Sequence, residues 1–384
     1  MSRPSADKTK RRKARKEEKE AQSRSRAAAR AKPMEPDLPP PEVLRAMHAK
    51  FLAEHERRER EGGAKPVMAA RLNDKTIVTV GGKLHYSTTW RTFADFLIDY
   101  VVEEVGVDWF EADWGRPPEQ RHPLSKLRAA FYEFSAAQPV ANGMIECAPS
   151  GPAYEYLLVS YELYLLAHHM KLQKLVIHRL KDPNLYQGAR YELFVAATCI
   201  KVGLLIEMED EEEGLIKRPE FIATHPQTST SFAVEAKRRH RDVKVERAEA
   251  RPPKADMGSL LGNAFRKKPA LPYLVFADVN LPPIDALDAA NPENVARQVE
   301  ETLKRLARNE EDGKDPFSVV VLTNRPDLYV DVHTPAPAAW AYFIAAENPR
   351  HGFLPLAVIE ALRRAVISQR ELPADVHDPV VARA

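Results

Sequence analysis

Cysteine is scarce in this sequence, and the scarcity excludes several kinds of site. The 384 residues include only Cys147 and Cys199, which are far apart and form no CxxC pair. A disulfide framework and a cysteine-based zinc site are therefore excluded, and a reducing compartment is favoured. No run approaches the about 20 apolar residues of a membrane helix, and the N-terminus lacks the apolar core of a signal peptide. We expect a cytoplasmic protein with no membrane partner.

The motifs of two large enzyme classes are also missing. The sequence has no GxSxG motif of the serine hydrolases and no GxxxxGK[ST] loop that binds nucleotide phosphates. His168 and His169 are adjacent, so on a helix they point in different directions and do not form a pair of metal ligands one turn apart. Serine hydrolase and P-loop functions are therefore disfavoured.

The net charge of +2 is small because a basic tail offsets an acidic body. Residues 1–32 carry 13 Lys or Arg against 4 Asp or Glu, whereas the rest of the chain carries 44 basic and 51 acidic residues. Residues 1–40 have almost no large apolar side chains and end in a proline-rich run, so we expect this segment to be disordered. The tail is either an arm that binds nucleic acid or another polyanion, or a segment that keeps the protein in solution.

Hydrophobic periodicity divides the remaining chain into three parts. Residues 41–183 are predicted to be a mainly helical domain that begins with a helix at Pro41–Glu61 and includes one short β-hairpin at 76–86. Residues 184–335 alternate between helical and strand-like segments, which predicts an α/β domain. Residues 336–384 are expected to form a C-terminal helix and a tail.

The α/β domain has a definite order of elements. We expect the order helix, three strands, helix, strand, helix, strand, over residues 188–201, 203–208, 220–223, 231–237, 256–268, 273–277, 291–309 and 317–323. The last of these strands is rich in valine, which indicates a central position in the sheet. Leu328–Val332 is a candidate for a further strand.

Two carboxylates and a lysine form the main chemical pattern of this domain. Glu220 begins the second predicted strand, and Glu235 and Lys237 lie on the third. Because side chains alternate along a strand, Glu235 and Lys237 share one face. Glu220, Glu235 and the carbonyl oxygen of Ala236 would supply the oxygen ligands that Mg²⁺ prefers. Lys237 would orient the attacking water or stabilise a phosphate, and it would act as a base only with a depressed pKa.

This pattern resembles the PD-(D/E)xK nuclease superfamily. Pro219-Glu220 matches the first motif element, Glu235-Ala-Lys237 matches the second, and Glu192 matches an additional glutamate of the first helix. The resemblance covers residues 188–280 and implies a restriction-endonuclease-like αβββαβ core with Mg²⁺ (or Mn²⁺) as the cofactor of phosphodiester hydrolysis. Glu220 departs from the pattern, since aspartate is commoner at that position.

Basic residues near this pattern are candidates for contacts with nucleic acid. Residues 237–254 contain eight basic and three acidic residues, and three basic residues end the helix predicted at 256–268. The first segment either grips phosphates or is a solvated linker, and the second either contacts phosphate or stabilises the helix end. The candidates are Arg238, Arg239, Arg241, Lys244, Arg266 and Lys267.

Three functional hypotheses follow. The first is a Mg²⁺-dependent nuclease, with DNA favoured as its substrate. The second is a nucleic-acid-binding protein that keeps the nuclease fold without activity, and the third is a scaffold whose helical region binds a protein partner or a second copy of the chain. The alternative for Glu235 and Lys237 is that they line a solvated face of the sheet and pair with other side chains. If the side chains of Glu220, Glu235 and Lys237 face opposite sides of the sheet, the first hypothesis fails. If it is right, the carboxyl groups of Glu220 and Glu235 should lie about 4–5 Å apart, close enough to share one cation.

Overall fold

The structure is a computed structural model. It describes residues 40–49, 67–140, 145, 147–168, 170–207, 219–240, 257–283, 292–308, 310, 312–368 and 372. The chain forms two compact units, Met1–Ala46 and Met47–Ala384. Residues 41–49 are helical, as predicted, and the predicted end of that helix at Glu61 lies outside the described residues. The tail predicted for residues 1–40 lies outside them too, except for Pro40.

A three-stranded antiparallel sheet comes first in the second unit. Its strands are β1 (Met68–Leu72), β2 (Lys75–Val80) and β3 (Lys83–Ser87), in the order β1-β2-β3. The predicted hairpin is β2–β3, whose two-residue turn at Gly81 and Gly82 has φ values of 56° and 84°. Such positive φ values match the twist of the strands and favour glycine at both positions. Strand β1 was not predicted.

A group of helices follows. They are α3 (Phe93–Val105), α4 (Val107–Trp114), α5 (Pro123–Ala136), α6 (Gly151–Leu165), α7 (Met170–Leu180) and α8 (Tyr186–Lys201). Helix α6 packs against α3, α5 and α8, and nearly all of its side chains are therefore buried. Helix α3 begins with a capping box, in which the Thr92 hydroxyl accepts from the backbone N–H of Asp95 and the Asp95 carboxylate accepts from that of Thr92.

The second unit also contains a mixed six-stranded sheet. Its strands are β4 (Leu205–Glu207), β5 (Phe221–His225), β6 (Thr230–Arg238), β7 (Tyr273–Asp278), β8 (Val319–Asn324) and β9 (Trp340–Ala345), which are adjacent in this order. Strands β6, β7 and β8 run parallel to one another, and each remaining pair is antiparallel. Three further helices are α10 (Gly258–Phe265), α11 (Pro292–Arg308) and α12 (Leu356–Ile367).

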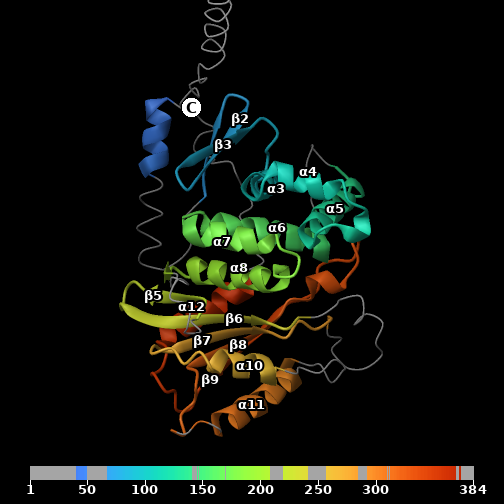
Figure 1. Ribbon diagram of the computed structural model, residues 1–384. Coiled ribbons are helices and arrows are strands. Elements are labelled where there is room, and N and C mark those ends of the chain that lie inside the picture. The colour runs from blue at the N-terminus through green and yellow to red at the C-terminus, as the bar shows by residue number, and fades with distance from the viewer. Residues whose placement is uncertain are drawn as a thin grey trace, which may run out of the picture. The chain divides into compact units, whose positions relative to one another are not determined.

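The two faces of this sheet are covered by different helices (Figure 1). Helix α8 lies on one face, with α6 and α7 behind it, whereas α10 and α11 lie on the other. Alternate residues of the strands divide between the two cores. The α8 face takes Phe232, Val234, Ala236, Leu274 and Phe276. The α10 face takes Ala233, Tyr273, Val275, Ala277 and Leu322. Alternation along β6 is therefore as the sequence predicted.

The order of elements from α8 to β8 is the one predicted from the sequence. It is a helix, three strands, a helix, a strand, a helix and a strand, so the mixed α/β class is confirmed. The strand predicted at Leu328–Val332 was wrong, because Pro326–Tyr329 forms a 3₁₀ helix there. Residues 336–384, expected to hold only a helix and a tail, also supply the edge strand β9. The border predicted near residue 184 falls between α7 and α8, which pack together in one unit.

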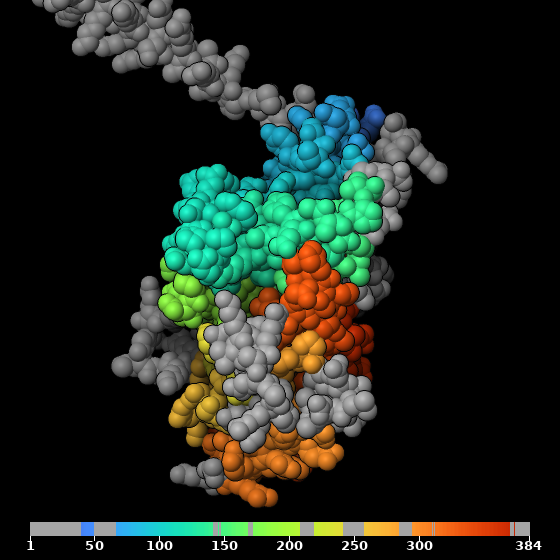
Figure 2. All heavy atoms as spheres, turned by 90° about the vertical axis from the view of Figure 1, so that its right-hand side faces the viewer, coloured from blue at the N-terminus to red at the C-terminus, as the bar shows by residue number. Residues whose placement is uncertain are grey.

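The segment after β8 returns to the helices. Pro335 forms a β-bridge with Ser150, and the N–H of Gly151 donates to the carbonyl of Thr334 at 3.2 Å. Figure 2 shows this segment in orange-red against the green start of α6. It therefore ties the end of the parallel strands to the helical layer. None of the described helices is long and apolar enough to cross a membrane.

Candidate active site

Glu235 lies in the middle of the sheet and its side chain is completely buried. Its strand β6 is bordered by β5 on one side and β7 on the other, and Glu235 pairs with Val275 of β7. The side chain turns to the α10 face, where its neighbours on the strand are Ala233 and Lys237. Burying a carboxylate is costly unless other groups compensate the charge. The negative charge of Glu235 therefore has to be compensated by neighbouring groups.

Glu220 reaches the same place from the neighbouring strand. It follows Pro219 and immediately precedes β5, and its N–H donates to the carbonyl of Val234 at 3.0 Å. This bond holds Glu220 beside the middle of β6, next to Glu235. Its side chain is 20% exposed, so it connects the buried Glu235 to solvent.

Two lysines contact both carboxylates. Lys237 Nζ forms an ion pair with Glu235 and lies 3.7 Å from Glu220 Oε1. Lys267, which follows α10, places its Nζ 2.8 Å from Glu235 Oε1 and 3.6 Å from Glu220 Oε1. Because each ammonium touches both carboxylates, the structure brings together the three residues of the sequence motif. We call Glu220, Glu235, Lys237 and Lys267 the acid–lysine cluster.

Glu192 joins this cluster through an arginine. Arg179 of α7 binds the Glu192 carboxylate with both terminal nitrogens, at 2.6 and 2.9 Å. The same guanidinium lies 3.9 Å from Glu220 Oε2. Glu192 comes from α8, on the opposite face of the sheet from α10. The contact with Arg179 therefore links the first-helix glutamate to the acid–lysine cluster.

The pKa values of these groups follow from burial and charge. Burial, together with the charge of Glu220, raises the pKa of Glu192 to about 7. Burial also raises the pKa of Glu235, although Lys237 and Lys267 oppose the change. For Lys237, burial disfavours the ammonium, but the neighbouring Glu235 outweighs it and the pKa is raised. A lysine with a raised pKa stays protonated near neutral pH, so Lys237 is suited to stabilising an anion and unsuited to acting as a base.

The donor set suits a hard divalent cation. Both carboxylate oxygens of Glu235 are buried, and the ammonium groups of Lys237 and Lys267 lie against this carboxylate. The described residues contain no group of three or more His, Cys, Asp or Glu side chains placed to hold a metal. Mg²⁺ commonly takes only one or two carboxylates and keeps several waters, so Glu220 and Glu235 fit such an ion. Ala236, predicted to offer its carbonyl, lies between the charged residues of β6 and turns its side chain to the other face.

The prediction that Arg238 binds nucleic acid disagrees with its position. Its side chain is only 5% exposed, forms an ion pair with Asp278 at 3.2 Å and donates to Asn280 at 3.1 Å. The residue next to it in sequence, Lys237, faces the site, so the strand alternation turns Arg238 inward on the other face. Arg238 therefore takes part in a buried ion pair, and its contact with nucleic acid stays a prediction.

The other basic residues predicted to bind nucleic acid lie in different surroundings. Arg239 continues the strand edge, where its N–H donates to the carbonyl of Asp278 at 3.1 Å. Arg266 is exposed at the end of α10, and Lys267 points into the acid–lysine cluster, where it contacts carboxylates. The predicted contacts by Arg241 and Lys244 lie outside the described residues.

The sequence did not place two members of the site beside the carboxylates. Arg179 was not singled out, because no spacing relates α7 to the strands that carry the motif. Lys267 was assigned to phosphate contact because it ends a helix in a basic run. Its distance in sequence from Glu235 gave no sign that the two residues meet. Both contacts are tertiary, and only the packing of α7 and α10 on opposite faces of the sheet produces them.

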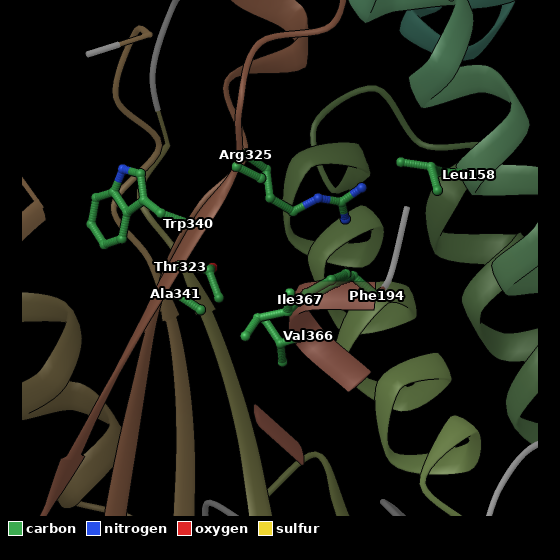
Figure 3. Close-up of a pocket in the computed structure, with 9 residues that line it drawn as sticks. Leu158, Phe194, Thr323, Arg325, Trp340, Ala341, Val366 and Ile367 are labelled. Atoms are coloured by element: carbon green, nitrogen blue, oxygen red, sulfur yellow. The ribbon is translucent and has the colours of Figure 1, made fainter. Parts of the chain in front are cut away.

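A separate cavity lies on the α8 face, between β8, β9 and α12 (Figure 3). It has a volume of about 100 Å³ and is mostly apolar, with the polar groups of Thr323 and Arg325 on its wall. The guanidinium of Arg325 lies 4.5 Å from the ring centre of Phe194 and binds Glu155 at 2.9 Å. No residue of the acid–lysine cluster lines this cavity, so it is distinct from the candidate site.

Neither a protein-family model, nor a curated protein, nor a solved structure matches this chain. Functional inference therefore depends on the geometry of the acid–lysine cluster and its chemistry.

Proposed function

We propose that this protein is a Mg²⁺-dependent nuclease of restriction-endonuclease-like fold, which hydrolyses phosphodiester bonds of nucleic acid, with DNA favoured. The observation that carries the proposal is the meeting of Glu220, Glu235 and Lys237 in one cluster on adjacent strands. The order helix, three strands, helix, strand around them supports it further. We place its action in the cytoplasm, as the low cysteine content favours.

Each residue has a defined part in this chemistry. Glu220 and Glu235 would hold the cation, which when bound would make a coordinated water more acidic and offset charge on the phosphate. Lys237, kept protonated by Glu235, stabilises negative charge that develops on the phosphate oxygens. Arg179 is a positioning residue that holds Glu220 from the other side of the sheet, and Glu192 positions Arg179.

The test is cleavage by the purified full-length chain. With Mg²⁺ or Mn²⁺ we expect cleavage of DNA or RNA, and EDTA should abolish it. Glu235→Gln and Lys237→Met should each lower the rate by about 100-fold or more, because each removes a charge that the transition state needs. Lys268→Met is the matched control, since Lys268 is 58% exposed and pairs with Glu310. Full activity in both site variants, with the fold checked by circular dichroism, would contradict the assignment.

A second function is favoured by the two lysines on the carboxylate pair. Because Lys237 and Lys267 already neutralise Glu220 and Glu235, the cluster is charge-balanced without a cation. A protein of this kind would bind nucleic acid without cutting it. Salt-sensitive binding of DNA, with no cleavage under any divalent cation, would support this second function over the first.

A further inference from the structure

Lys267 has the most unexpected position in the site. The turn that follows α10 carries it, and its ammonium lies 2.8 Å from Glu235 and 3.6 Å from Glu220. Its side chain is only 14% exposed, whereas the next residue, Lys268, points away to Glu310. The chain therefore directs one lysine of a basic pair into the site and the other to the surface.

Charge balance explains what Lys267 does in the absence of a cation. Two carboxylates, Glu220 and Glu235, face two ammonium groups, Lys237 and Lys267. Glu235 is fully buried, so an ammonium close to it offsets the cost of its burial. Lys267 thus stabilises the cluster by occupying a position beside the carboxylate oxygens.

A divalent cation needs the same oxygens. A cation bound at about 2.1 Å from these oxygens would lie in close contact with an ammonium held on the same atom, and the two like charges would repel. One lysine must therefore withdraw. Lys237 belongs to strand β6, which at this position is paired with Ala277 of β7. Lys267 lies on the turn that follows the short helix α10, outside the sheet, so we expect Lys267 to be the lysine that shifts.

We propose that Lys267 is a built-in counter-ion that competes with the divalent cation for Glu220 and Glu235 and, once displaced, binds a phosphate oxygen of the substrate. This inference rests on the proposed nuclease function. It assigns Lys267 a regulatory position in the site, since the cation enters only by displacing it. The proposal also gives a role to Lys267, the second lysine of the site, whereas the sequence motif contains only Lys237.

The proposal is tested by the affinity for the metal alone. Isothermal titration of Mg²⁺ or Mn²⁺ into the metal-free full chain should show binding about tenfold tighter or more in Lys267→Met than in the unsubstituted protein, because a nearby like charge has been removed. Lys268→Met should leave the affinity unchanged, and Glu235→Gln should abolish binding. Lys267→Gln, which keeps a polar side chain, serves as a second variant if the methionine variant does not fold.

Binding of uncleaved DNA gives the other half of the test. With Ca²⁺ in place of Mg²⁺, Lys267→Met should bind DNA more weakly than the unsubstituted protein, while Lys268→Met should not. Equal metal affinity in the Lys267 variants and the unsubstituted protein would overturn the proposal and leave the nuclease function standing. If the unsubstituted protein binds no divalent cation and cuts no nucleic acid, both the nuclease function and this proposal fail.

Discussion

A buried network of two arginines and two glutamates joins the helices to the sheet, and it makes a quantitative prediction. Arg190 of α8 is fully buried and binds Glu155 at 2.7 Å and Glu162, both from α6. Arg325, which follows β8, binds Glu155 at 2.9 Å and lies 3.7 Å from Glu162. Burial opposes ionisation of Glu155, yet both arginines lower its pKa below the ordinary value. The network is therefore charged and internally balanced.

The perturbation is Arg190→Met, which removes one of the two positive charges. The two buried carboxylates then lose the guanidinium that binds both of them, and Arg325 stays as a remaining ion-pair partner. Breaking a buried ion pair by removing one partner costs about 3–5 kcal/mol. A typical domain is stable by only about 5–15 kcal/mol, so this variant should lose a large part of its stability.

The matched control restores the balance of charge. In Arg190→Met/Glu162→Gln, one carboxylate and one guanidinium remain, so the double variant should be more stable than the single variant by about 1–3 kcal/mol. Urea unfolding followed by circular dichroism measures both free energies of unfolding, and equal slopes against urea show that the same transition is compared. The reasoning is refuted if the double variant is less stable than Arg190→Met alone.

Two further predictions concern stability. Burial lowers the pKa of His122 from 6.5 to about 4, so the unfolded chain binds more protons than the folded chain between these two pH values. The contribution of His122 to stability is therefore fully present above pH 6.5. About 2–3 kcal/mol of the free energy of unfolding should be lost as the pH falls toward 4. His122→Asn should flatten this pH dependence in thermal melts, and an NMR titration that gives an ordinary pKa would contradict it. A Cβ at Gly151 would overlap the carbonyl oxygen of Asp327 and the side chain of Val330, so Gly151→Ala should lower the free energy of unfolding in urea by about 1–3 kcal/mol. The control is Gly115→Ala, whose added Cβ meets no atom closer than 3.5 Å and should change the free energy of unfolding little.

The sequence predicted the sheet well where a local pattern decides the structure. Alternation along β6 placed Glu235 and Lys237 on one face, and the packing of Ala233 and Val234 on opposite faces agrees with it. Strand β9 was missed because its alternation is imperfect and because prolines precede it. No strand forms at Leu328–Val332 because Pro326, in the first turn, favours the short 3₁₀ helix that is found there.

The site was predictable only in part, because its membership depends on contacts between distant segments. Glu220, Glu235 and Lys237 follow from a motif within one hairpin, which the sequence displays directly. Arg179 lies on α7 and Lys267 on the turn after α10, and these two helices cover opposite faces of the sheet. No local pattern in the sequence relates either segment to the hairpin that carries the motif. The sequence shows that Lys267 is one of three consecutive basic residues, but it does not show that the Lys267 side chain contacts a carboxylate.

The end of β6 shows how strand alternation separates chemistry from stability in a run of like charges. Lys237 and Arg238 are adjacent and both basic, yet they face opposite sides of the sheet. Lys237 meets Glu220 and Glu235, whereas Arg238 forms a buried ion pair with Asp278. If the proposed nuclease function holds, loss of Lys237 should affect catalysis and cation binding, whereas loss of Arg238 should affect chiefly the free energy of unfolding. A basic segment that enters a strand is for this reason better interpreted position by position than as one surface for nucleic acid.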